Sequence, residues 1–263
     1  SSAASDVYKR QNQSVAMKNA GSSVRHLGAV GEDGEWMVEK LSSAGVDTAR
    51  IVSLSGPSGH AIITIADDGE NAITIFPGAN RLIDSDQVQL WLATISATDW
   101  LVLQNETSQQ RLAAELAKSR GARVVYSAAP FDAEVVADIL PFIDFLCVNE
   151  IEAAALINHF NVKSLNNLGV NALLITHGSQ GAVYHNFEKK LEITVKGIPV
   201  QVVDTTGAGD TFCGYFIALL SQGKDPLAAL NIANKAAALK VTKLGTADAI
   251  PSLVDVLDFN NER

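Results

Sequence analysis

Short apolar runs alternate with amphipathic stretches along most of the chain. The runs at residues 100–104 and 145–148 carry hydrophobic side chains on both faces, which is typical of strands in a parallel sheet covered on both sides. The stretches between such runs repeat their apolar residues at helical spacing. This rhythm predicts an α/β protein with helices on both faces of a mostly parallel sheet.

The predicted elements follow one another in this rhythm from residue 24 onward. The predicted strands span residues 24–30, 100–104, 123–126, 145–148, 172–176, 181–187, 191–195 and 200–203. The predicted helices span residues 35–44, 108–120, 207–222 and 226–241, and a further helix follows Asn149.

One segment breaks the βα rhythm. Residues 60–66 and 72–76 are β-branched stretches of period two, joined by the polar sequence Asp67-Asp68-Gly69-Glu70-Asn71. This pattern predicts an antiparallel hairpin within residues 59–77. An antiparallel appendage does not fit easily inside a parallel sheet, so we expect it to project as a lid over the strand ends, where open α/β sheets bind ligands.

Composition and charge narrow the function further. The chain has 263 residues, 47% of them hydrophobic and 19% charged, which fits one large folded domain. The net charge of −9 and the scattered Lys and Arg argue against a nucleic-acid partner, although backbone dipoles and Mg²⁺ can still bind a nucleotide. No window approaches the ~18 apolar residues of a membrane span. Only Cys147 and Cys213 occur, without metal-ligand spacing, which favours the reducing cytoplasm.

The first eleven residues differ from the rest of the chain. They are polar and aperiodic and end in Asp6-Val7-Tyr8-Lys9-Arg10-Gln11, which resembles an in-frame translation of a transposon end used in sequencing libraries. We therefore expect residues 1–11 to be a foreign leader and residues 12–263 to form the domain. A native disordered leader is the alternative.

The most informative string is Asp204-Thr205-Thr206-Gly207-Ala208-Gly209-Asp210-Thr211, where an apolar run gives way to small residues and then to an apolar helix. Small residues allow the backbone to approach a ligand closely. We expect the N–H groups of Ala208, Gly209 and Asp210 to lie unpaired in the first helical turn, with the positive end of the helix dipole behind them. This arrangement would bind a phosphoryl group during transfer.

A carboxylate at a turn that binds phosphate needs an explanation of its own. Asp210 would repel the phosphate, but as a general base it would take the proton from the attacking hydroxyl. An ordinary Asp is ionised at neutral pH and could do this without adjustment of its pKa. The alternative is that Asp204 or Asp210 only caps the helix.

The full string resembles the signature of the ribokinase-like sugar kinases, also called the phosphofructokinase B family, and the resemblance extends from Asn12 to about Pro251. It implies a ribokinase-like three-layer α/β/α sandwich with a small β lid. It also implies ATP-dependent phosphorylation of the primary hydroxyl of D-ribose to ribose 5-phosphate, with Gly207, Ala208 and Gly209 as the anion hole. The alternatives are a fructokinase, an adenosine kinase, a keto-deoxy acid kinase or an inactive nucleotide-binding fragment. No dinucleotide fingerprint supports an NAD-dependent enzyme.

The resemblance also implies sites for the nucleotide and for two metal ions. Asn149 and Glu152 match residues that organise Mg²⁺ and its waters, although the same pair would form a capping box. Residues matching the nucleotide site are Thr176, Gly178, Gly181 and Asn234, for which a plain turn and a polar helix face are the alternatives. The residues implied around K⁺ are Asp204, Thr206, Lys240, Lys243 and Gly245. Ala249 stands where many members of the family have a serine.

On the sugar side, Asn12 and Glu106 match residues that contact the sugar. The glycines and lysine that precede this Asn in the family, and the strand before them, have no counterpart here. We therefore expect a sheet without an early strand, a lid that is partly missing, and weak sugar binding beside an intact ATP half. The resemblance implies a small-molecule sugar and ATP as partners, and a homodimer formed through the lid.

Overall fold

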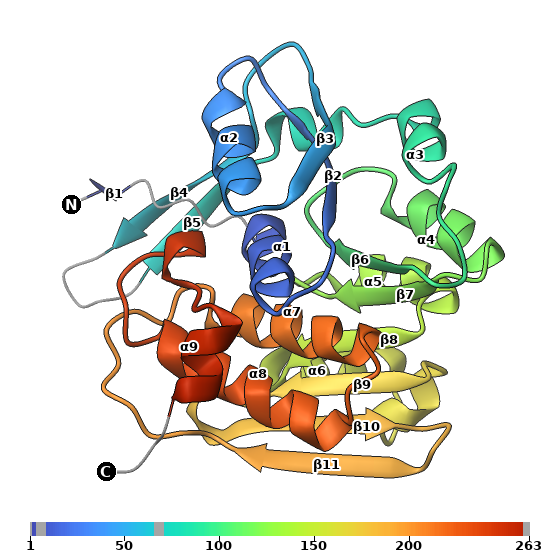
Figure 1. Cartoon of the computed structure of the whole chain (residues 1–263). Helices are drawn as coiled ribbons and strands as arrows, with labels where there is room; N and C mark the ends of the chain where they lie inside the picture. The colour runs from blue at the N-terminus through green and yellow to red at the C-terminus, as the bar shows by residue number, and fades with distance from the viewer. Residues whose placement is uncertain (1, 4–8, 66–70, 260–263) are drawn as a thin grey trace.

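The computed structural model describes residues 2–3, 9–65 and 71–259 and contains a six-stranded sheet in the order β11-β10-β9-β8-β7-β6 (Figure 1). The parallel strands are β6 (Trp100–Gln104), β7 (Arg123–Ser127), β8 (Phe145–Asn149) and β9 (Ala172–Thr176). Strands β10 (Gly181–Asn186) and β11 (Leu191–Lys196) add to one edge in antiparallel fashion. The carboxyl ends of the parallel strands therefore lie along one edge of the sheet.

Helices cover both faces of this sheet, as the apolar runs predict. The helices on one face are α1 (Lys9–Asn19), α7 (Ala208–Ser221) and α8 (Pro226–Lys240), and those on the other include α4 (Gln110–Ser119), α5 (Ala133–Ile139) and α6 (Glu150–Phe160). Successive side chains of β8 alternate between two cores: Phe145 and Cys147 pack under α7, whereas Leu146 and Val148 pack under the opposite layer. The predicted three-layer sandwich is confirmed.

Strands β2 (Arg25–Val30) and β3 (Asp47–Ser53) form a separate two-stranded parallel sheet, connected by α2 (Glu35–Ser43). A cavity of about 530 Å³ lies between β2 and β6 and is lined by residues of both strands. The remaining helices are α3 (Ser85–Trp91), α9 (Leu253–Asp258) and the short 3-10 helices η1 (Gly78–Arg81), η2 (Leu140–Phe142), η3 (Leu165–Leu168), η4 (Gly178–Gln180) and η5 (Ala247–Ala249). Among the described residues, no helix is long and apolar enough to cross a membrane.

The lid hairpin consists of β4 (His60–Ile65) and β5 (Asn71–Phe76), which pair in antiparallel fashion as the sequence predicts. Residues 66–70, which hold most of the predicted turn, lie outside the described part of the chain. The two-residue strand β1 (Ser2–Ala3) pairs with β4, and Lys9–Gln11 form the start of α1. Residues predicted to be a foreign leader thus contact both the lid and the main helical layer.

The predicted strand at residues 200–203 is wrong. Val202 and Val203 are each 57% exposed, and no strand is assigned between β11 and α7. The N–H groups of Val203 and Asp204 both donate to the carbonyl of Val241, at 2.7 and 3.1 Å. The segment is therefore held by the carboxyl end of α8 and not by a neighbouring strand.

Candidate active site

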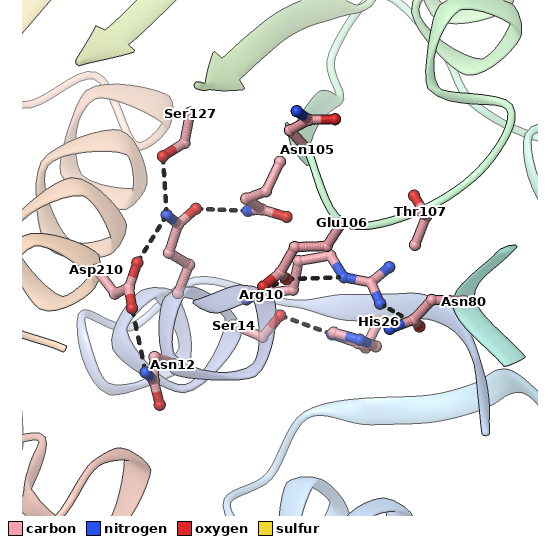
Figure 2. A network of polar contacts seen from close by, with 12 residues as sticks. Arg10, Asn12, Ser14, His26, Asn80, Asn105, Glu106, Thr107, Ser127 and Asp210 are labelled. Carbon is pink, nitrogen blue, oxygen red and sulfur yellow. Dashed lines mark hydrogen bonds and ion pairs between the residues drawn. The ribbon is translucent and has the colours of Figure 1, made fainter. Parts of the chain in front are cut away.

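The ends of four parallel strands bring distant polar residues together. Asn149 and Thr176 are paired at the ends of β8 and β9, and Gln104 and Ser127 are paired at the ends of β6 and β7. The first turn of α7 and the helix α1 lie against this edge, so residues from opposite ends of the chain meet here (Figure 2).

Asp210 lies in the first turn of α7 and is only 9% exposed. Each oxygen of its carboxylate accepts one hydrogen bond from a side-chain amide. Asn12 Nδ2 donates to Oδ2 at 3.1 Å, and Gln13 Nε2 donates to Oδ1 at 3.2 Å. Burial raises the pKa of Asp210, while the charge of Lys9 and the two amide hydrogen bonds lower it, and the net pKa lies above the ordinary value. The carboxylate is therefore fixed in position and is more basic than an exposed Asp.

Gln13 connects Asp210 to the sheet. Its Nε2 also donates to Ser127 Oγ at 3.1 Å, and its Oε1 accepts a hydrogen bond from Gln104 Nε2 at 2.5 Å. All three of these side chains are buried. This network could not be predicted from local sequence patterns, because its members are separated by 91 to 197 positions along the chain.

The residues predicted to form an anion site lie in the turn before α7, and the structure corrects one detail of that prediction. Gly207 has φ +74°, and a Cβ there would lie 3.2 Å from Asn12 Nδ2, whereas the space in front of Gly209 is open. The N–H of Ala208 is not unpaired as expected, because it donates to the carbonyl of Thr205 at 3.1 Å. Within the described chain, the N–H groups of Gly209 and Asp210 have no hydrogen-bond partner. The site therefore offers two backbone donors, not three.

A cavity of about 640 Å³ lies between the lid hairpin and the strand ends and is lined by Glu106 and Glu152 among others. Arg10 extends into it: its Nη2 donates to Asn80 Oδ1 at 2.8 Å, and its Nε lies 3.5 Å from Glu106 Oε2. Burial raises the pKa of Glu106, Arg10 lowers it and the nearby charge of Asp210 raises it, with a net increase. Arg10, which was predicted to belong to the leader, thus contacts Glu106, which the resemblance assigns to the sugar.

Asn149 and Glu152 form the capping box that was the alternative to metal binding. The Asn149 N–H donates to Glu152 Oε2, and the Glu152 N–H donates to Asn149 Oδ1, both at 2.8 Å. Burial raises the pKa of Glu152, and the Asn149 N–H and the charge of Lys9 lower it by less. Among the described residues, no cluster of three or more His, Cys, Asp or Glu side chains could hold a metal ion. Any Mg²⁺ here would need oxygens from its own waters and from phosphates.

The residues predicted for the nucleotide lie apart from that cavity. Gly181 has φ +108°, and a Cβ there would meet the Val195 carbonyl oxygen at 2.0 Å, so close backbone approach requires glycine. Strand β9 ends at Thr176, and after His177 the 3-10 helix η4 begins at Gly178. The amide of Asn234 is buried and donates to the Lys196 carbonyl at 2.8 Å, where β11 ends.

Asp204 and Lys240 form hydrogen bonds that hold the turn before α7 in place. Asp204 Oδ1 accepts the Thr206 N–H at 2.9 Å, and its Oδ2 accepts the Gly245 N–H at 3.0 Å. The Lys240 ammonium donates to the Asp204 carbonyl oxygen at 3.0 Å and lies 3.8 Å from Oδ2. Burial raises the pKa of Asp204, but the hydrogen bonds from Thr206 and Gly245 and the charge of Lys240 outweigh it, and the net pKa is lowered. The exposed side chain of Lys243 does not share these contacts.

A buried carboxylate beside two backbone donors suits transfer of an anionic group to a hydroxyl, and a comparison with known families agrees. Residues 9–253 match the model of the pfkB family of carbohydrate kinases. The chain belongs to this family. It is therefore a phosphotransferase that acts on a sugar hydroxyl, and the family predicted from the string 204–211 is confirmed.

Within this family, the chain is similar in sequence and structure to several ribokinases. A ribokinase of Haemophilus influenzae is 35% identical over 266 residues, which covers 95% of this chain and 86% of that protein. A ribokinase of Cryptococcus neoformans in complex with ADP superposes with a TM-score of 0.83 at 30% identity, covering 95% of this chain and 87% of the other. An Arabidopsis thaliana ribokinase complexed with ribose and ATP gives a TM-score of 0.83 at 28% identity, covering 96% and 87%.

Proposed function

We propose that this protein transfers the γ-phosphate of ATP to the primary hydroxyl of D-ribose, forming ribose 5-phosphate and ADP. The carrying observation is the position of Asp210, a buried carboxylate held by two amides directly beside the unpaired N–H groups of the α7 turn. The ribokinases of similar sequence and structure, one of them solved with ribose and ATP, support the choice of substrates.

In this proposal Asp210 is the general base. It removes the proton of the sugar hydroxyl as the hydroxyl oxygen forms its bond to the γ-phosphorus, and the bond from that phosphorus to the bridging oxygen of ADP breaks. The N–H groups of Gly209 and Asp210, at the positive end of the α7 dipole, stabilise the charge on the phosphoryl oxygens. The raised pKa of Asp210 makes it a stronger proton acceptor than an exposed Asp.

The 640 Å³ cavity supplies the sugar site in this scheme. Glu106 and Asn80 present a carboxylate and an amide to sugar hydroxyls, and Asn12 lies beside the base. The lid hairpin borders the cavity through His60 and Phe76, so its closure would keep water from the phosphoryl donor.

We assign the nucleotide to the strand ends at Thr176, Gly178, Gly181 and Asn234. The oxygens of Glu152 and Asn149 suit Mg²⁺, a hard cation that keeps several waters and takes one or two carboxylates together with phosphates. When bound, Mg²⁺ would neutralise charge on the transferred group. Glu152 lines the cavity, and among the described residues its carboxylate accepts a hydrogen bond from the Asn149 N–H alone.

The proposal also covers the domain bounds, the oligomeric state and the location of the protein. We assign residues 12–263 to the kinase domain, residues 59–77 to its lid, and residues 1–11 to a foreign leader. Strand β5 lies at the edge of the β1-β4-β5 sheet and offers backbone groups for pairing with a second copy, so we propose a homodimer through the lid. The two cysteines are buried and unpaired, in keeping with a cytoplasmic location.

The test is Asp210→Asn, measured by sugar-dependent ADP release with ribose and, for comparison, fructose and adenosine. We expect turnover to fall by about 10²- to 10⁴-fold, because only proton transfer is lost, with Mg·ATP affinity nearly unchanged by calorimetry. Turnover within threefold of the parent would remove Asp210 as the base. A higher kcat/KM on adenosine or fructose than on ribose would overturn the choice of sugar.

A further inference from the structure

The last residue of α8 is a buried lysine that follows an alanine-rich stretch of the helix. Lys240 follows Ala236, Ala237, Ala238 and Leu239, and its side chain is 0% exposed. A buried ammonium is unfavourable unless it is paired and hydrogen-bonded. Because this buried ammonium lies next to the turn before α7, we expect Lys240 to have an electrostatic role in that turn.

Within the described part of the chain, the polar contacts of the Lys240 ammonium are all to Asp204. The ammonium donates to the Asp204 carbonyl oxygen at 3.0 Å and lies 3.8 Å from its Oδ2. The same carboxylate accepts the N–H groups of Thr206 and Gly245, so the ammonium joins the turn before α7 to the loop after α8. Burial lowers the pKa of Lys240, and the negative charge of Asp204 raises it in part.

These contacts occupy part of the ligand set that the resemblance implies around K⁺, namely the oxygens of Asp204 and the Lys240 carbonyl oxygen. Both carboxylate oxygens of Asp204 already accept backbone N–H groups, and its carbonyl oxygen accepts the ammonium. The Lys240 carbonyl oxygen accepts the Lys243 N–H at 3.1 Å. A second cation about 4 Å from the ammonium would be repelled enough to weaken its binding about a thousandfold at an effective dielectric constant of about 20.

We infer that the Lys240 ammonium is a built-in cation that takes the place of a free monovalent ion in holding the Asp204–Gly207 turn for phosphoryl transfer. This inference rests on the proposed function, because it concerns activation of that reaction. A tethered charge needs no binding equilibrium with the solvent. The rate of the kinase is therefore independent of which monovalent cation is present.

The first experiment compares initial rates of the full chain in KCl, NaCl and tetramethylammonium chloride at equal ionic strength. We expect rates within about twofold of one another, since Lys240 supplies the charge in each salt. A rate in KCl more than about tenfold above that in tetramethylammonium chloride overturns the inference, and this comparison needs no variant to fold.

The second experiment exchanges the tethered cation for a free one. Lys240→Ala removes the ammonium and opens space, so we expect at least a tenfold loss in tetramethylammonium chloride and substantial recovery in KCl. Lys240→Met removes the charge but fills the space, so we expect the loss without recovery. Lys235→Ala on the same helix is the matched control, and its initial rates should be as similar in the three salts as those of the parent. A Lys240→Ala variant with parental rates in every salt contradicts the role of Lys240.

A third measurement separates this inference from the proposed function. Mg·ATP affinity is measured by calorimetry in the same three salts, which requires no turnover. Equal affinities in the parent, together with K⁺-dependent affinity in Lys240→Ala, support the built-in cation even if Asp210→Asn shows that the base is misassigned. K⁺-dependent affinity in the parent contradicts the built-in cation even if the sugar kinase activity is confirmed.

Discussion

Replacing Gln13 with Met tests how the active-site carboxylate is held. Met has nearly the shape of Gln but cannot donate to Asp210 Oδ1, where the present N···O distance is 3.2 Å. A hydrogen bond to a charged group contributes about 1.5–3 kcal/mol, and one pKa unit corresponds to about 1.4 kcal/mol. The lost donor favours the protonated carboxyl, so the pKa of Asp210 rises further. The acidic limb of the kcat profile should therefore move upward by about 1 to 2 pH units.

The sign of this effect distinguishes it from damage to the fold. A base works only when deprotonated, so the variant loses most activity at low pH and approaches the parent at high pH. Lys9 and Glu106 are the other charged groups near Asp210, and both remain in place. The assay is sugar-dependent ADP release across about pH 5 to 9, with thermal unfolding as a check on folding.

Ser127→Ala is the matched control for this variant. It removes the hydroxyl that accepts from Gln13 Nε2 at 3.1 Å but leaves the contact between Gln13 and Asp210. Its pH profile should coincide with that of the parent. If the acidic limb of Gln13→Met also coincides with the parent, or if kcat falls by the same factor at every pH, then Gln13 does not tune the base and the reasoning fails.

Three further predictions follow from single contacts. Arg10→Ala frees the Glu106 carboxylate, so we expect KM for ribose to fall several-fold in steady-state kinetics, whereas the exposed Arg25→Ala should leave it unchanged. Tyr215→Phe removes a buried 2.6 Å hydrogen bond to the Pro251 carbonyl and should lower the free energy of unfolding, measured in urea, by about 1 kcal/mol; an unchanged free energy of unfolding would contradict this. Glu152→Gln weakens a carboxylate offered to Mg²⁺, and the Mg²⁺ concentration for half-maximal rate should rise; no rise would exclude Glu152 from the metal site.

The sequence predicted the elements whose apolar residues are regularly spaced and buried. Strand β8 was recognisable because its first four residues are all apolar and fully inside. Strand β3 was missed because it is half exposed and mixes polar residues with only a short apolar run. The wrong strand at residues 200–203 had the apolar pattern of a strand, but the N–H groups of Val203 and of the following Asp204 donate to the Val241 carbonyl. Local pattern could not show which backbone partner was available.

The candidate site divides in the same way. The string 204–211 is continuous, so its turn and the neighbouring helix could be predicted together. Whether a given N–H is free depends on the local geometry, and the Ala208 N–H turned out to be used by Thr205. Gln13 could not be singled out, because its role depends on partners from β6, β7 and α7. Arg10 was set aside with the leader, although it reaches the centre of the site.

One buried and two half-buried carboxyl groups share this site, and the first turn of α1 opposes their charge. Burial raises the pKa of Glu106, Glu152 and Asp210, and Lys9 opposes that increase at all three. Mg²⁺ and sugar hydroxyls would need the same carboxylates, so their binding competes with Lys9 and Arg10. The helix that carries these two cations also supplies the amides that hold Asp210. We therefore propose that substrate binding and alignment of Asp210 are coupled through the position of α1.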